Sequence, residues 1–530
     1  MAGRKVRHFL LCETLTRVNH KDALARIAQL PTAEPAAALR DGLTLINADY
    51  PELLLPAARR LAERHAASAQ AHQLAGLAAR AAGESAIALA AFAAAARLAP
   101  RDALIAHSHA RTALDAGTPA AALFAAAGAL APQDGGVILG HSAALLHEGQ
   151  PDAAIARLTT VLRANPLWLD GHRSLAAILA QMSGDPLSEI TAALARNPRS
   201  AELHHCAIAI ALQARDLEQA DAAVAAARTA LGLPSWLALM AAHVASERGA
   251  LAAADAHLAA AGAPVDVGNG WLHARHQIRA RRPDAAAAVL EPLLGMPGDA
   301  QLWPYLSLAW RMLGDERAAW LEADPRLVGV YDLGLSPAEL RTLADHLRAL
   351  HFAKAAPLDQ SVRGGTQTDG NLLLRIEPPI RDLKARLLAI VDRHVAQLPP
   401  PPPPPAGLPA HPTLPERRSP QRIAGSWSVR LTGAGFHTDH VHPQGWFSSA
   451  LYLALPETLG DGAADHAGWL SLGEARDLVP ELGPFRLIEP KPGRLVLFPS
   501  TMWHGTRTFP AGERLTVAFD IARPRQDLPS

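Results

Sequence analysis

Apolar residues recur at helical spacing through roughly the first 320 residues of the chain, where alanine and leucine dominate. In the segment 85–100, SAIALAAFAAAARLAP, the larger apolar side chains are spread over successive helical turns, and a proline closes the run. Apolar positions three and four residues apart share one face of a helix, so this pattern predicts amphipathic helices that pack against one another. We therefore expect residues 1–320 to form a helical domain.

Proline closures recur along this helical region at a nearly constant interval. They stand at Pro100, Pro132, Pro166, Pro198, Pro234, Pro264 and Pro297. Glycine-containing breaks, such as HEGQPDAAI at 147–155, divide the intervals into two helices each. A period of about 33 residues with two helices per unit is typical of a helical solenoid. We expect each proline to end one helix and to occupy the first turn of the next.

The pattern changes after about residue 320. Residues 324–334 are expected to be extended, and 360–375 to form a loop that leads into a strand or turn. Helices are predicted at 336–351, with Ser336 as the N-cap, and at 378–398. From residue 424 short apolar runs separated by turn signals predict strands at 426–432, 446–456, 468–473, 494–500 and 514–521. Short strands without long intervening helices predict a sandwich or barrel.

A run of seven prolines, 399–405, interrupts this second region. Such a run is extended as polyproline II, which can be a ligand for a proline-recognition domain or a spacer. We expect a spacer within a proline-rich insertion at 399–420, because structured sequence resumes soon after it. The chain is thus predicted to have two domains, 1–320 and 324–523.

Composition excludes several classes of function. The formal net charge is zero, so the chain has no global basic field for nucleic acid or anionic lipid. Two distant cysteines, Cys12 and Cys206, give no disulfide framework and suit a reducing cytoplasm. No apolar run approaches the ~18 residues of a membrane span. We expect a cytoplasmic protein that binds neither nucleic acid nor membrane.

The segment GFHTDHVHP, residues 435–443, places three histidines and one aspartate within six residues. Residues i and i+2 of a strand point to the same face. Two pairs can therefore aim ligands at one metal ion: His437 with Asp439, or His440 with His442. A polar loop rich in histidine, with no metal, is the third interpretation.

A third metal ligand should come from a neighbouring strand. His504 is the candidate, since it follows the apolar run 494–500 and lies 62 residues after His442. Ten residues further on, Arg514 and Thr516 share one strand face. A guanidinium in this position can bind a carboxylate in a bidentate fork.

This order of motifs resembles the non-haem iron, 2-oxoglutarate-dependent dioxygenases, and in particular the bacterial branch fused to N-terminal tetratricopeptide repeats. The stretches that carry the resemblance are QSVRGGTQT, SWSVRLTGAGFHTDHVHPQGWFSSALYLALP, KPGRLVLFPSTMWHGTRTF and RLTVAFDI. The resemblance covers roughly residues 324–523. It implies a double-stranded β-helix (a jelly-roll or cupin-like fold), Fe(II) as cofactor and 2-oxoglutarate as cosubstrate, preceded by an α-solenoid.

The resemblance also implies site residues. The metal ligands are His440, His442 and His504, with Arg514 and Thr516 for the far carboxylate of 2-oxoglutarate. The wider superfamily has His-x-Asp where this chain has His440 and His442, so His437 with Asp439 stays open as the alternative pair. The Pro-Gln-Gly-Trp turn after His442 favours the histidine pair. Further pocket candidates are Tyr452, Trp427, Trp446, Trp503 and Arg363. The alternative role is packing in the core for the tyrosine and the tryptophans, and turn capping or a surface position for Arg363.

The predicted function is that of a hydroxylase whose repeats recruit a protein or peptide substrate. Two other functions remain possible on the sequence. One is an interaction scaffold with an inactive oxygenase-like domain, and the other is a cupin-like metal protein that does not use 2-oxoglutarate.

Overall fold

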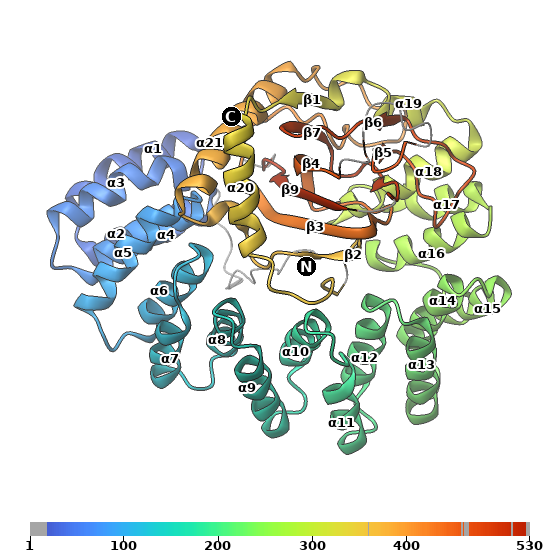
Figure 1. The fold of residues 1–530 in the computed structure, drawn as a ribbon, viewed down its shortest axis with the longest axis horizontal. Helices are drawn as coiled ribbons and strands as arrows, with labels where there is room; N and C mark the ends of the chain where they lie inside the picture. Colours follow the sequence, from blue (N-terminus) through green and yellow to red (C-terminus); the bar gives the residue numbers. More distant parts are fainter. Residues whose placement is uncertain (1–17, 359, 457–458, 460–465, 510–511, 526–530) are drawn as a thin grey trace.

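A curved array of helices wraps around a β-sheet domain in this protein (Figure 1). The structure is a computed structural model that describes residues 18–358, 360–456, 459, 466–509 and 512–525. The predicted fold class, an α-solenoid of tetratricopeptide-like repeats followed by a double-stranded β-helix, is confirmed. Among the described residues, no helix combines the length and the apolar character that crossing a bilayer requires.

Nineteen α-helices of the described chain make up the array, and from α4 onward they pair in successive repeats. The first is α1 (His20–Gln29), followed by α2 (Pro35–Asn47), α3 (Pro51–Arg64), α4 (Ala69–Ala81), α5 (Ser85–Leu98), α6 (Ala103–Asp115), α7 (Ala121–Leu130), α8 (Gly135–His147), α9 (Pro151–Ala164) and α10 (Leu169–Gln181). The array continues with α11 (Ser188–Arg196), α12 (Ala201–Gln213), α13 (Leu217–Leu231), α14 (Ser235–Glu247), α15 (Leu251–Ala261), α16 (Val267–Arg279), α17 (Pro283–Leu290), α18 (Trp303–Leu313) and α19 (Arg317–Glu322).

The proline closures follow the second helix of each pair, but they do not enter the next helix as expected. Pro100 and Pro132 each lie two residues before an N-cap aspartate. The carboxylates of Asp102 and Asp134 accept hydrogen bonds from backbone N–H groups of the first turn. The first-turn prediction was wrong here because a capping side chain, which proline lacks, takes the position that begins the helix.

The turn between the two helices of a repeat contains one residue with a left-handed backbone. These residues, with φ between 58° and 77°, are Asp49, Gly83, Gly117, Gly149, Ser183, Arg215, Gly249, Arg281 and Gly314. Glycine adopts this conformation without steric cost, whereas other residues are strained by roughly 1 kcal/mol or more. Four of the nine positions therefore carry a side chain at the expense of backbone strain.

In the part of the chain after the array that the structure describes, there are two further α-helices and nine strands. The helices are α20 (Pro337–Ala349), which begins with a capping box at Ser336, and α21 (Pro378–Gln397). The strands are β1 (Gly329–Asp332), β2 (Val362–Gln367), β3 (Ile423–His437), β4 (Gly445–Ala454), β5 (Leu470–Leu472), β6 (Arg486–Ile488), β7 (Arg494–Pro499), β8 (His504–Thr506) and β9 (Glu513–Ala522). Both predicted helices and the five predicted strands are present.

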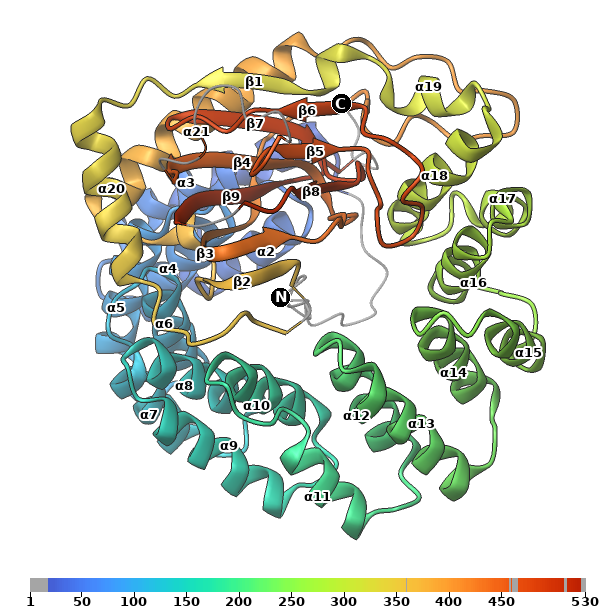
Figure 2. The same cartoon turned by 45° about the vertical axis from the view of Figure 1, so that its right-hand side comes forward.

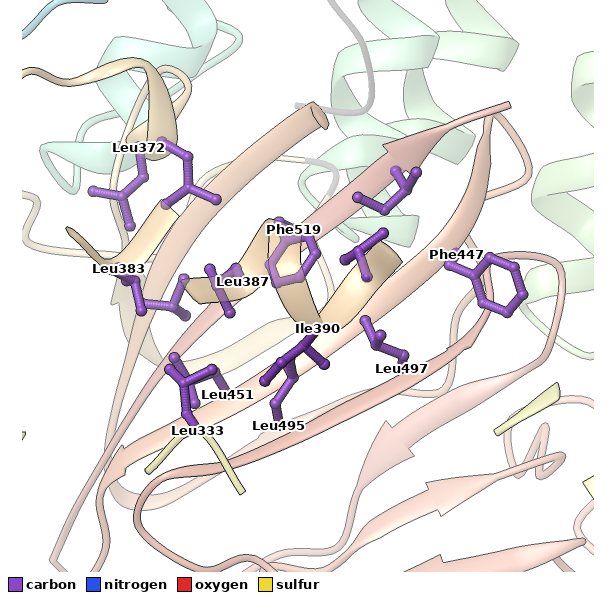
Figure 3. Close-up of a cluster of buried hydrophobic side chains, with 14 of the residues drawn as sticks. Leu333, Leu372, Leu383, Leu387, Ile390, Phe447, Leu451, Leu495, Leu497 and Phe519 are labelled. Atoms are coloured by element: carbon purple, nitrogen blue, oxygen red, sulfur yellow. The ribbon is translucent and has the colours of Figure 1, made fainter. Parts of the chain in front are cut away.

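The strands form two antiparallel sheets, as a double-stranded β-helix requires. The larger has the order β1-β7-β4-β9-β3-β2, and the smaller has the order β6-β5-β8. One face of the larger sheet packs on α20 and α21 through a core that includes Leu387, Leu451 and Phe519 (Figure 3). The other face packs on the smaller sheet through Tyr452, Leu472 and their neighbours.

Residues 399–420, the predicted insertion, form no helix or strand. They pack back onto the end of the array: the Trp320 indole donates to the carbonyl of Pro403 at 3.2 Å, and His411 bonds to the carbonyl of Leu321 at 3.1 Å. The predicted boundary between residues 320 and 324 stays a prediction.

The array curves around the sheet domain (Figure 2) and contacts it near both ends and in the middle. Near the N-terminal end of the array, Asp49 and Glu52 pair with Arg422. In the middle, the carbonyl of Gln181 accepts from the backbone N–H of Lys354 at 2.8 Å. Near the other end, the Trp503 indole donates to the carbonyl of Pro304 at 2.9 Å. Contacts of this kind fix the position of the array relative to the sheets.

Glu322 gives this contact region a pH dependence. It is buried at the end of α19 and accepts a hydrogen bond from the Ser307 hydroxyl. Burial raises the pKa of Glu322 from 4.5 to about 7. Because the folded-state pKa lies above the unfolded one, the contribution of Glu322 to stability is greatest below about pH 4.5 and falls as the pH rises to about 7.

Ionisation of Glu322 should lower the free energy of unfolding of the wild type by about 1–3 kcal/mol between about pH 5 and about pH 8. We therefore expect Glu322→Gln to lack this decrease. The amide keeps an acceptor for Ser307 and cannot ionise. Thermal unfolding at both pH values measures the difference. The exposed Glu316, which precedes the same helix, is the control, and Glu316→Gln should follow the wild type. An identical pH profile for Glu322→Gln would contradict the prediction.

Candidate metal site

Three histidines converge between the two sheets. His440 and His442 lie in the segment after β3, and His504 begins β8. One ring nitrogen of each lies within 4.8 Å of the corresponding nitrogens of the other two. A β-bridge joins His440 to His504, with backbone N–O distances of 2.9 and 3.0 Å, and the N–H of His442 donates to Ser500. The backbone therefore fixes where these rings stand.

The hydrogen bonds of the three rings favour one tautomer. The Nδ1 atom of His440 lies 2.8 Å from the carbonyl oxygen of Thr438, and that of His504 lies 3.0 Å from the carbonyl of Met502. The Nδ1 atom of His442 lies 2.9 Å from both carboxylate oxygens of Asp520. An Nδ1–H that donates to oxygen leaves the Nε2 lone pair free to bind a metal.

The surroundings of His440 and His504 favour their neutral form. Burial, reinforced by the neighbouring histidines, holds the pKa of His440 and of His504 well below its ordinary value. Neutral imidazole nitrogens are ligands for divalent iron and related transition metals. The residues present therefore fit an iron site with three protein ligands, all of them uncharged.

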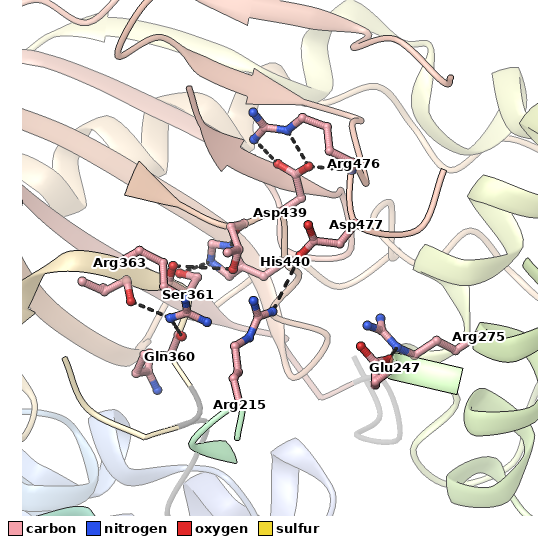
Figure 4. A network of polar contacts seen from close by, with 12 residues as sticks. Arg215, Glu247, Arg275, Gln360, Ser361, Arg363, Asp439, His440, Arg476 and Asp477 are labelled. Carbon is pink, nitrogen blue, oxygen red and sulfur yellow. Dashed lines mark hydrogen bonds and ion pairs between the residues drawn. The ribbon is translucent and has the colours of Figure 1, made fainter. Parts of the chain in front are cut away.

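Asp439, a member of the alternative pair, points away from the three rings. Its side chain is 1% exposed and accepts from the guanidinium and the backbone N–H of Arg476, with the latter at 2.7 Å (Figure 4). His437 lies nearer: its ring stacks on His440 at 6.1 Å, and its Nδ1 is 2.9 Å from the Ser361 hydroxyl. Burial lowers the pKa of His437 to about 3. The structure thus brings His440, His442 and His504 together and does not bring Asp439 to them.

Asp520 is a site residue that the sequence interpretation missed. It lies on β9 on the same face as Arg514 and Thr516, and Ser448 on the neighbouring strand donates to it at 2.7 Å. A carboxylate that accepts from a metal-binding histidine fixes the ring and increases its basicity. The sequence could have indicated Asp520, because it lies an even number of residues after Arg514 on one strand and so shares its face.

Arg514 lies on that inner face as a buried cation with no acidic partner among the described residues. It is 2% exposed and lies over the ring of Tyr452, with 5.0 Å from the guanidinium carbon to the ring centre. In the described chain its Nε has no hydrogen-bond partner, and the polar side chain that acts on the guanidinium is that of Tyr452. Burial lowers the pKa of Arg514. A buried and unpaired guanidinium is costly unless an anion binds to it.

The remaining candidates have different surroundings. Thr516 is buried beside Arg514. The Trp427 ring lies 5.5 Å from that of His442 and so borders the site, while Trp446 donates to the carbonyl of Thr413 and belongs to the outer core. Arg363 donates to the backbone carbonyls of Gln360 and Val362 (Figure 4).

Comparison with known proteins agrees with the sequence resemblance. Residues 425–520 match the family described as "Putative 2OG-Fe(II) oxygenase", and the resemblance is confirmed over that segment. A search of curated proteins gives no match.

Solved structures similar to parts of the chain are of two kinds. MamA from Desulfovibrio magneticus is 16% identical, with a TM-score of 0.28, and the match covers 32% of this chain and 98% of MamA. A prolyl-4-hydroxylase from Pseudomonas putida is 19% identical, with a TM-score of 0.25, over 38% of this chain and 94% of the hydroxylase. HygX from Streptomyces hygroscopicus, solved with nickel and 2-oxoglutarate bound, is 14% identical, with a TM-score of 0.26, over 37% of this chain and 82% of HygX.

The geometry predicts which histidines hold a metal. We expect His442→Ala and His504→Ala to lose bound iron, because each removes one of the converging Nε2 atoms, and His437→Ala to retain it. Metal content after anaerobic loading and dialysis measures the difference. Unchanged iron in His504→Ala would exclude the site, and loss in His437→Ala together with Asp439→Ala would favour the alternative pair.

Asp520 should tune metal affinity through His442. We expect Asp520→Asn to weaken iron binding by about 10- to 100-fold, because the carboxylate that orients the ring is lost. Competition with a metal-sensitive chelator measures the affinity. Ser448→Ala is the matched control, since it removes another partner of Asp520 and leaves the bond to His442 in place. Equal affinities for Asp520→Asn and Ser448→Ala would contradict this role.

Proposed function

We propose that this chain, whose residues 425–520 match the 2OG-Fe(II) oxygenase family, is an Fe(II)- and 2-oxoglutarate-dependent dioxygenase of the hydroxylase type. The convergence of His440, His442 and His504 within the matched segment is the observation that carries the proposal. In this assignment the three Nε2 atoms hold the iron. When bound, iron and 2-oxoglutarate would supply, with dioxygen as the oxidant, oxidative decarboxylation to succinate and carbon dioxide, in which one oxygen atom enters succinate and the other enters a substrate C–H bond.

Arg514 is proposed to bind the far carboxylate of 2-oxoglutarate. The guanidinium lies on the inner face of β9, two residues from Thr516 and six from Asp520. The ring of Tyr452, on the neighbouring strand, packs against the guanidinium of Arg514. Because Arg514 is buried, solvent does not screen its charge. A dianionic cosubstrate would satisfy Arg514 and would also neutralise a +2 ion held by three uncharged histidines.

Among the described residues, Asp520 supplies the only carboxylate that is hydrogen-bonded to one of the three rings, that of His442. Its charge reaches the ion through His442, so it partly replaces the acidic ligand of the wider superfamily. Ser361 contacts two of the rings: its hydroxyl lies 2.9 Å from Nδ1 of His437 and 3.2 Å from Nε2 of His440. In this assignment His440 exchanges its contact with Ser361 for the iron, and Ser361 keeps its contact with His437.

The helical array is proposed to recruit a protein or peptide substrate. Helical repeat arrays present an extended concave surface, and they rarely carry out chemistry themselves.

The cytoplasmic location expected from the cysteine content stays a prediction. Cys206 is buried in α12, and Cys12 lies outside the described residues.

Cosubstrate binding tests the proposal directly. Anaerobic protein with Fe(II) and 2-oxoglutarate should show a weak visible charge-transfer band, and Arg514→Ala should weaken 2-oxoglutarate binding by about tenfold or more while iron content is kept. Titration of the band measures this affinity. Arg430→Ala is the control, because Arg430 lies on the adjacent strand and is already paired with Glu513. The absence of both the band and succinate formation would favour a scaffold without oxygenase activity.

A further inference from the structure

A cleft of about 220 Å³ opens beside His440, at the junction of the array and the sheet domain. Arg215, Arg275 and Tyr305 line it from the array. His440, Val441 and Trp503 line it from the sheet domain. Any substrate that reaches the proposed iron through this cleft therefore touches both parts of the chain.

Arg215 occupies this cleft at the expense of a strained backbone. It is one of the left-handed turn residues, with φ of 58°, where most repeats have glycine. At the equivalent position Arg281 donates to the carbonyl of Leu478 at 2.7 Å and pairs with Glu481. Arg215 has a weaker partner, Asp477 at 3.8 Å, and the two side chains are 51% and 56% exposed. The contacts of Arg281 therefore offset the cost of its strained backbone, whereas the weak ion pair of Arg215 does not.

A second guanidinium stands close to Arg215. Arg363 donates to backbone carbonyls and has no ion pair with a carboxylate in the described chain. Burial and then the charge of Arg215 lower the pKa of Arg363, so the two cations repel each other (Figure 4). The nearby Arg275 and Arg279 share one carboxylate, Glu247.

The mouth of the cleft therefore has an excess of positive charge. Two of the four guanidinium groups, on Arg215 and Arg275, line the cleft, and those of Arg279 and Arg363 lie next to them. Among the described residues, the lining carboxylates are Asp439, which Arg476 already pairs, and Asp477. Glu247 is shared by Arg275 and Arg279. An anionic ligand would relieve this imbalance.

A row of rings leads along the inner helices to the same cleft. His243 on α14 lies 5.7 Å from Trp271 on α16, which lies 6.0 Å from Tyr305 on α18. Tyr305 in turn lies 5.6 Å from Trp503, the residue before His504. Tyr305 and Trp503 line the cleft and are 8% and 4% exposed, whereas His243 and Trp271 do not line it. The edges of Tyr305 and Trp503 offer a polypeptide side chain an apolar contact that a small anion would not use.

We propose that this cleft binds an extended acidic segment of a polypeptide substrate, with a substrate carboxylate on Arg215 and Arg363 and the chain passing Tyr305 and Trp503 toward His440. This inference rests on the proposed function and names its substrate class. Nucleic acid fits less well, because its affinity depends on many phosphate contacts and the chain has no net positive charge.

Peptide binding to the full chain without iron tests the cleft separately from catalysis. The probe is a fluorescein-labelled dodecapeptide of alternating Glu and Gly, followed by fluorescence anisotropy. We expect it to bind about tenfold or more tightly than the matching Gln–Gly peptide. Equal binding of the two peptides, or tighter binding of a single-stranded oligonucleotide of equal length, would overturn the proposal.

Substitutions at the left-handed turn residues Arg215 and Arg281 test where the Glu peptide binds. Arg215→Gly relieves the strained backbone while it removes the guanidinium, so we expect an unchanged or higher Tm together with loss of the preference for the Glu peptide. Arg363→Gln should weaken the Glu peptide as well. Arg281→Gly is the matched control and should retain the preference. Unchanged binding of the Glu peptide by Arg215→Gly would overturn the proposal for the cleft. Failure of the proposed oxygenase function is distinguishable, because it would show as unchanged iron content in His504→Ala.

Discussion

The alternation of side chains along β9 is the constraint on which the site depends. Its odd-numbered residues, such as Leu515 and Phe519, face α20 and α21 and build the outer core. Its even-numbered residues, Arg514, Thr516 and Asp520, face inward because a strand has a period of two. A register slip of one residue would bury the charged groups against the helices and remove both the carboxylate behind His442 and the cation near the site. The large apolar core on one face therefore secures the position of the polar groups on the other.

The wrapped array adds a second constraint at the entrance of the site. Its turns place Arg215, Arg281 and the carbonyl of Gln181 against the sheet domain from one side. Solenoid repeats commonly present a concave surface that is open to partners. Part of that surface is occupied here by the chain's own sheets, and the cleft beside His440 lies where the two surfaces meet. Substrate recognition and chemistry are thereby brought within one small space.

Much of this arrangement follows from the sequence, because it depends on local patterns. Proline spacing indicated the repeats, apolar runs indicated the principal strands, and the order of His440, His442, His504 and Arg514 indicated one site. Strands β6 and β8 were not anticipated, since three residues are too few to show a period. The two candidate ligand pairs are equivalent in spacing, and only tertiary contacts separate them: the bridge between His440 and His504, and the ion pair that turns Asp439 to Arg476. Asp520 and Arg215 depend on strand register and array curvature, which neighbouring residues do not reveal.

The anchoring of the array at both ends bears on how its length can evolve. Repeat proteins commonly gain or lose units, because each unit contacts only its neighbours. In this chain the first repeats are tied to the sheet domain through Asp49 and Arg422, and the last through Arg311, which donates to the carbonyl of Gly483. The helices between these anchors must span a fixed arc around the sheets. Insertion or deletion of a single repeat would break one anchor or shift the cleft from the histidines, so repeat number should be held constant among proteins that share this architecture.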